Sequence, residues 1–118
     1  MSKHSGKAAS WTLADGVFEF ELHREPCNEI GTALLEDLER FVEATRTAEN
    51  DADAIIIYST MGPGFCAGAD LRELYAGMQG VSIEERVAGV RRFLERIHAV
   101  MNALDASPLV TIAATHGV

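Results

Sequence analysis

The stretch AIIIYSTMGPGFCAGADL, residues 54–71, decides the fold. Its aliphatic start over residues 54–58 is typical of a strand that helices cover on both faces, as in a parallel sheet. The small residues that follow suit a backbone that must approach another group closely or adopt dihedrals that a β-carbon forbids. Asp70 then predicts a helix that begins at Leu71, because its carboxylate can accept a backbone N–H of the first turn.

The flanking sequence adds the elements of an α/β domain. Asp15 and Gly16 join two alternating segments over residues 11–23, which predicts a β-hairpin. An amphipathic stripe over residues 32–49 predicts a helix. The run LVTIAA, residues 109–114, predicts a second buried strand.

A long helix is predicted between the short helix and this second strand. Ser82 and Glu85 form a capping box at its start, and Ser107-Pro108 ends it. Apolar residues recur along it at alternating steps of four and three, so we expect this seam to pack into the core. Its members are Ile83, Val87, Val90, Leu94, Ile97, Met101 and Leu104.

Composition narrows the class of protein. The 118 residues, with 47% hydrophobic and 24% charged residues, indicate one globular domain. A net charge of −8 argues against nucleic acid as a partner. Cys27 and Cys66 form no CxxC pair, which favours free thiols in a reducing compartment. Without a signal peptide or an apolar run long enough for a bilayer, the sequence predicts a cytoplasmic protein with no membrane contact.

We expect a flexible N-terminus over residues 1–10 and a single domain over residues 11–118. The first ten residues, MSKHSGKAAS, are polar. Glycines 62 and 64 with Ala67 fit a dinucleotide-binding spacing, but the next strand begins far too late, near Leu109, and Pro63 removes a donor. We therefore reject a dinucleotide site.

The end of the small-residue loop can present a hydrogen-bond donor. Ligands of open α/β sheets bind beyond the carboxyl ends of the strands, where this loop lies. Amides at the start of a helix have no helical partner and lie at the positive end of its dipole. The N–H of Ala69, reached past Ala67 and Gly68, could therefore polarise a carbonyl oxygen, which is worth roughly 3 kcal/mol in a dry site. The alternative interpretation is that these small residues only form a tight connection between the strand and the helix and have no function.

The residues FCAGADLREL, 65–74, resemble the signature loop of the crotonase, or enoyl-CoA hydratase/isomerase, superfamily. The opening hairpin, REPCNEI at 24–30, DADAIIIYST at 51–60 and SPLVTIAATHGV at 107–118 resemble the same family in the same order. The resemblance implies an α/β fold of ββα units coiled into a spiral (ClpP/crotonase type), which this chain would form only in part.

The resemblance also implies a substrate and a site. The substrate class would be acyl-CoA thioesters, with coenzyme A as part of the substrate and neither a separate cofactor nor a metal. Ala69 matches the family's first oxyanion-hole donor, a backbone N–H that stabilises a thioester enolate. Cys27 lies in a turn that matches a CoA-side segment, although the turn is compressed here and carries Glu29. The other positions that match the CoA-binding loop are Ala67, Gly68, Asp70, Leu71 and Arg72.

The chain resembles only the N-terminal half of a family member. In the family, the strand that ends in THGV leads into a glycine-rich turn with the second oxyanion donor, and the catalytic carboxylates come later. None of the 18 Asp and Glu residues matches a catalytic position. We therefore expect the parent to be a lyase or isomerase of fatty acid metabolism, and the 118-residue chain itself to be inactive.

Two functional hypotheses follow from this partial match. The first is the acyl-CoA-binding portion of such an enzyme, whose full-length relatives are usually trimers or hexamers. The second is a non-catalytic CoA-binding or assembly module. A fragment should expose the unpaired side of its last strand and associate or aggregate, whereas a module should be a discrete oligomer.

Overall fold

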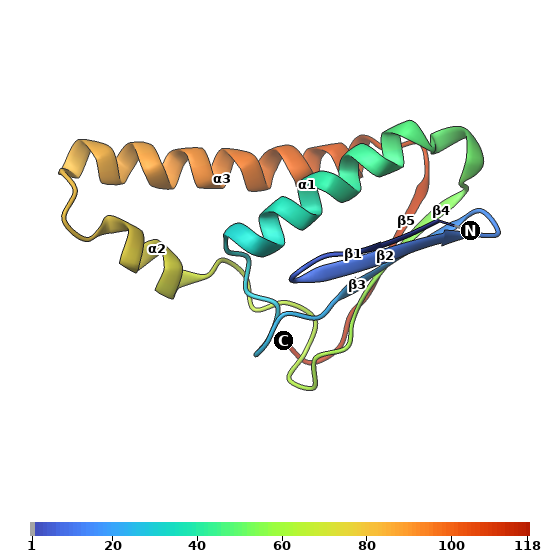
Figure 1. The fold of residues 1–118 in the computed structure, drawn as a ribbon, viewed down its shortest axis with the longest axis horizontal. Helices are drawn as coiled ribbons and strands as arrows, with labels where there is room; N and C mark the ends of the chain where they lie inside the picture. Colours follow the sequence, from blue (N-terminus) through green and yellow to red (C-terminus); the bar gives the residue numbers. More distant parts are fainter. Residues whose placement is uncertain (1) are drawn as a thin grey trace.

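The computed structural model describes residues 2–118 and contains one five-stranded sheet in the order β1-β2-β3-β4-β5 (Figure 1). Helices α1 and α3 lie over one face of this sheet, and α2 lies beside the far end of α3 (Figure 1). The α/β class expected from the sequence is therefore confirmed. The strands are β1 (Ser2–Ser5), β2 (Ala9–Ala14), β3 (Val17–Leu22), β4 (Ala54–Ser59) and β5 (Val110–Ala114). The helices are α1 (Thr32–Thr47), a 3₁₀ turn (Glu49–Asp51), α2 (Leu71–Met78) and α3 (Ile83–Ala106).

Because β3, β4 and β5 are parallel, their carboxyl ends lie on the same side of the sheet. β2 and β3 form the predicted hairpin, with Asp15 and Gly16 at positive φ values of 52° and 79°. β3 runs parallel to β4, and β4 runs parallel to β5. The segments that follow these three strands therefore emerge side by side, which is where ligands of such sheets bind.

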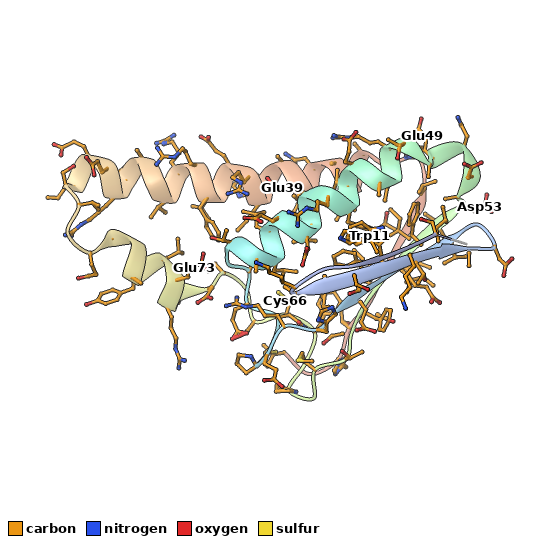
Figure 2. All side chains as sticks on the ribbon, viewed as in Figure 1. Trp11, Glu39, Glu49, Asp53, Cys66 and Glu73 are labelled. Carbon is orange, nitrogen blue, oxygen red and sulfur yellow. The ribbon has the colours of Figure 1, made fainter. Side chains whose placement is uncertain are left out.

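The core lies between α1 and the sheet. Phe41 of α1 packs against Phe18 and Phe20 of β3, with ring centroids 5.6 and 4.4 Å apart. Trp11 fills the space between α1 and β2, 5.4 Å from the Phe41 ring (Figure 2). Burying each such side chain contributes about 1.5–3 kcal/mol. The stripe predicted on this helix is buried as expected: Leu34, Leu35, Leu38, Phe41 and Val42.

Strand β1 is an element that the sequence did not predict. Residues 2–5 pair antiparallel with β2, where we expected a flexible segment over residues 1–10, of which Met1 lies outside the described residues. Their polar side chains carry no apolar alternation, so the pattern gave no signal. Asp37, buried on α1, fixes the following turn because it accepts the N–H groups of Ala8 and Ala9 at 2.8 and 3.1 Å.

The prediction that the α3 seam packs into the core is wrong for most of its length. Of the predicted seam, Ile97 and Leu104 do pack against the core, whereas Phe93 and Val100 take the places expected for Leu94 and Met101, one residue away. The α3 residues that contact the core are Phe93, Ile97, Val100, Ala103 and Leu104. Periodicity predicts an apolar face but does not say what covers it. The seam residues that remain exposed, by 41–72%, are Ile83, Val87, Leu94 and Met101.

Helices cover less of strands β4 and β5 than the sequence predicted. Every residue of β5 is exposed, and of β4 only Ile55 is fully buried. The helices cover one face of the sheet instead of two, and β5 has an unpaired edge (Figure 1). The radius of gyration of 15.2 Å exceeds the value of about 13.5 Å for a compact domain of this length. Apolar surface of both α3 and β5 is thus open in this chain.

Polar substitution of the open α3 face should leave the fold intact. The triple variant V87Q/L94Q/M101Q should change the free energy of unfolding by no more than about 0.5 kcal/mol per site, because these side chains are exposed. It should also bind less of a hydrophobic dye such as anilinonaphthalene sulfonate. Val100→Gln, on the buried face of the same helix, should destabilise by roughly 1–3 kcal/mol. Urea unfolding measures the stability of the triple variant and of Val100→Gln. Equal destabilisation by the two would contradict the exposure of one face of α3 and the burial of the other.

Candidate functional site

The candidate site forms where the turn after β3 lies against the loop after β4. Three backbone hydrogen bonds join the two segments in parallel: Ala67 N–H to Cys27 C=O at 3.0 Å, Ile30 N–H to Gly68 C=O at 2.8 Å, and Asp70 N–H to Ile30 C=O at 2.9 Å. Ile30 and Ala69 are the partners of a parallel bridge. The extended small-residue loop is therefore held against the turn by backbone pairing beyond the carboxyl ends of β3 and β4, and it is not a free connection.

This pairing leaves the Ala69 N–H without an internal acceptor. Ile30 bonds to the residues on either side of Ala69, so the N–H of Ala69 itself faces away from Ile30. Within residues 2–118, it donates no hydrogen bond. Ala69 also lines an open cleft of about 570 Å³. The other lining residues are Arg24, Glu25, Pro26, Glu29, Ala67, Asp70, Leu71 and Arg72.

Asp70 holds the start of α2 and binds the turn at the same time. One carboxylate oxygen accepts the Glu73 N–H at 3.1 Å, which is the predicted N-cap. The other oxygen pairs with the Arg24 guanidinium at 2.7 Å. The hydrogen bond from Arg24, and next the one from the Glu73 N–H, hold the pKa of Asp70 below its usual value. Asp70 is therefore ionised at neutral pH although it is only 8% exposed.

Asn28 anchors the turn to the loop from inside the protein. Its side chain is fully buried and its φ is 56°. The amide nitrogen donates to Ser59 Oγ and to the Phe65 carbonyl, both at 2.8 Å, and the amide oxygen accepts the Arg24 N–H at 2.8 Å. Every polar atom of this side chain is used within the protein, so Asn28 shapes the cleft without facing it.

Glu73 joins α2 to the start of α1. Its carboxylate accepts the N–H of Thr32 at 2.9 Å and also the Thr32 hydroxyl. Helix α1 has no side-chain cap of its own, since its N-cap residue is Gly31. A β-carbon at Gly31 would fall on the Glu73 carboxylate. Glu73 thus caps a helix that lies about 40 residues earlier in the chain (Figure 2).

The predicted site residues do not all face the cleft. Ala67, Ala69, Asp70, Leu71 and Arg72 line it, whereas Cys27 and Gly68 are not among its lining residues. Cys27 contributes its backbone carbonyl to the loop pairing instead.

Cys66 belongs to the loop after β4 and is partly buried. Its thiol donates to the Asn28 carbonyl at 3.2 Å. Burial raises the pKa of the Cys66 thiol, and the neighbouring Gly68 N–H opposes part of that shift. A raised pKa disfavours the nucleophilic thiolate. The thiol therefore has the properties of a packed side chain and not those of a nucleophile.

The family model that describes enoyl-CoA hydratase/isomerase matches residues 12–118. The chain belongs to this family. A relative named as a probable enoyl-CoA hydratase, echA6, from Mycobacterium leprae is 32% identical over 108 residues. The echA6 protein of Mycobacterium bovis, with the same name, is 30% identical over 107 residues.

Solved structures of the family share the fold. An enoyl-CoA hydratase from Bacillus anthracis superposes with a TM-score of 0.76 at 29% identity and covers 94% of this chain. A protein from Geobacillus kaustophilus gives 0.78 at 20% identity and covers 95%, which supports the fold alone. The crotonase-type fold is thereby confirmed.

The match covers the chain but only part of each relative. This chain spans 38% of the M. leprae protein and 40% of the B. anthracis structure. The crotonase-type fold is therefore present in incomplete form. None of the helices that the structure describes is both long and apolar enough to cross a membrane.

The Arg24–Asp70 pair predicts a pH dependence of stability. The pKa of Asp70 is lower in the folded chain than in the unfolded one, so its carboxylate stabilises the fold above about pH 4 and this contribution is lost as the pH falls further. Asp70→Asn keeps an N-cap oxygen but removes the charge. The variant should be less stable than wild type near neutral pH and should lose less stability on acidification.

Urea unfolding at several pH values measures this effect. The control is Asp105→Asn on α3, which removes an exposed carboxylate and should leave the pH profile unchanged. Parallel profiles for wild type and Asp70→Asn would contradict the role of the ion pair.

Proposed function

We propose that this chain is the acyl-CoA-binding portion of an enoyl-CoA hydratase/isomerase, and that the Ala69 N–H is one donor of its oxyanion hole. One observation carries the proposal: Ala69 lines an open cleft, and its N–H makes no hydrogen bond within residues 2–118. A buried or cleft-facing amide without a partner is costly unless a ligand or water satisfies it. The oxygen of a thioester carbonyl is an acceptor of the required kind.

The chemistry of the family's substrates gives this donor a role. When a proton leaves or joins the α-carbon of a thioester, negative charge develops on the carbonyl oxygen. A fixed N–H aimed at that oxygen stabilises the charge, and removal of one such donor typically costs about 3 kcal/mol of transition-state stabilisation. The neighbours of Ala69 are small, so the pantetheine arm and the carbonyl can approach the backbone.

The same proposal predicts that the isolated chain does not turn over substrate. General acid–base groups contribute roughly 10²–10⁴-fold each, and two of the three carboxylates that line the cleft already have partners within the protein. Asp70 caps α2 and pairs with Arg24, and Glu29 accepts the Cys27 N–H at 2.9 Å. We propose that the acid, the base and the second donor belong to the part of the family fold that this chain does not span.

A titration followed by NMR tests the proposal. Butyryl-CoA added to the ¹⁵N-labelled chain should shift the Ala69 amide proton downfield, more than the amides of Ala67 and Asp70, which already have internal acceptors. Free coenzyme A, which lacks the carbonyl, should not produce that shift. Crotonyl-CoA should show no hydration above background. Saturable turnover of crotonyl-CoA, or an Ala69 amide signal that does not shift when butyryl-CoA is added, would overturn the proposal.

Ala69→Pro is the matched variant. It deletes the proposed donor but breaks no internal hydrogen bond within the described residues, so the free energy of unfolding should change little. Affinity for butyryl-CoA should fall, and a full-length parent carrying the change should lose catalysis. Ala67→Pro is the contrasting variant, because it removes the bond to Cys27 and should destabilise the loop.

The assembly module remains the second candidate, because in a module a partner chain would cover the apolar surface that a fragment leaves open. Four large side chains of α3 and the whole of β5 are exposed. Unpaired strand edges of this kind bind further strands or cause aggregation. Size-exclusion chromatography with light scattering separates the two candidates: concentration-dependent, heterogeneous association supports the enzyme portion, and one discrete oligomer supports the module.

A further inference from the structure

The direction of the Ala69 N–H depends on how residues 69 and 70 are held. The loop pairing supplies Asp70 N–H to Ile30 C=O at 2.9 Å on one side of Ala69 and Ile30 N–H to Gly68 C=O at 2.8 Å on the other. The peptide between residues 68 and 69 carries both the Gly68 C=O and the Ala69 N–H, so its rotation would break the bond from the Ile30 N–H. Ile30 and Gly68, however, are only partly buried, so water can compete for these backbone bonds.

Arg24 adds a side-chain connection at this point. One guanidinium nitrogen binds Asp70 Oδ2 at 2.7 Å, and the other donates to the carbonyl of Glu29. The backbone of Arg24 is itself fixed, since its N–H donates to the Asn28 side chain and its C=O accepts the Asn28 N–H, both at 2.8 Å. The planar guanidinium thus bridges the turn and the residue directly after Ala69.

Both oxygens of Asp70 are engaged in this arrangement. Oδ1 accepts the Glu73 N–H at the start of α2, and Oδ2 accepts Arg24. A change in the orientation of Asp70, the residue directly after Ala69, would therefore disturb the ion pair or the helix cap. Arg24 is 29% exposed at the side chain, so its removal leaves the fully buried Asn28 anchor in place.

We propose that Arg24, acting through Asp70, is a positioning residue that fixes the Ala69 N–H toward the cleft. This inference rests on the proposed function, because a direction of the N–H matters only if a carbonyl binds there. Arg24 acts on the donor and not on the reacting atoms. Without Arg24, the chain should therefore no longer distinguish a ligand with the carbonyl group from one without it, whether or not its stability also falls.

The test compares two ligands that differ only at the carbonyl. Butyryl-CoA carries the thioester oxygen, and S-butyl-CoA is the thioether without it. Wild type should bind the thioester about fivefold more tightly, the value of one ordinary hydrogen bond. Arg24→Met, which keeps the aliphatic stem but neither donor, should bind the two ligands about equally. Arg24→Lys keeps the charge beside Asp70 but cannot reach both acceptors, and should be intermediate.

Arg40→Met is the matched control. Arg40 pairs with Asp37 on α1 at 3.3 Å and lies outside the cleft lining. Its replacement should leave the thioester preference unchanged even if stability falls. In ¹⁵N spectra without ligand, Arg24→Met should move the Ala69 amide signal while the buried Leu34 amide stays in place. This spectrum also shows directly that the variant is folded.

The outcomes separate this inference from the proposed function. A wild-type chain without a thioester preference overturns the proposed function and the inference together. A wild-type preference that Arg24→Met retains in full overturns the inference alone. If Arg24→Met proves unfolded, Arg24→Lys decides: an unchanged preference rejects the positioning role, and a reduced one supports it.

Discussion

The pairing of residues 27–30 with residues 66–70 is the constraint on which the candidate site depends. It places an isolated parallel bridge between Ile30 and Ala69 beyond the carboxyl ends of β3 and β4, outside the sheet proper. Because a parallel bridge uses the N–H and C=O of only one partner, it leaves the amide of the other free. Here that partner is Ala69. The small residues of the loop allow this close backbone contact on one side and leave room for a ligand on the other.

Local signals in the sequence predicted the elements around the site correctly. Asp15-Gly16 determined the hairpin, and Asp70 and Ser82 each accept the N–H of the third residue that follows, as N-caps do. These features depend on neighbouring residues only. The family resemblance placed Ala69 at a binding site, as did the rule that ligands of open α/β sheets bind beyond the carboxyl ends of the strands. Ala69 lines a cleft in the structure.

Features that join distant segments were not visible in the sequence. The Arg24–Asp70 pair spans 46 residues and the Glu73–Thr32 cap spans 41, and no spacing rule reports such contacts. The prediction that the α3 seam is buried was wrong for a different reason. Apolar periodicity shows which face is apolar, but here Phe93 and Val100 contact the core where the seam predicted Leu94 and Met101. The open stripe and β5 lie in a chain that spans 38–40% of its relatives, so most of the family's fold is not available here to cover them.

The central claim is that the Ala69 N–H donates to the carbonyl oxygen of a bound thioester. Isotope-edited infrared spectroscopy of butyryl-CoA labelled with ¹³C at the carbonyl tests it most directly, because a hydrogen bond lowers the stretching frequency of that group. The account predicts a lower frequency for the ligand bound to wild type than for the ligand bound to Ala69→Pro. The same frequency in both complexes would contradict it.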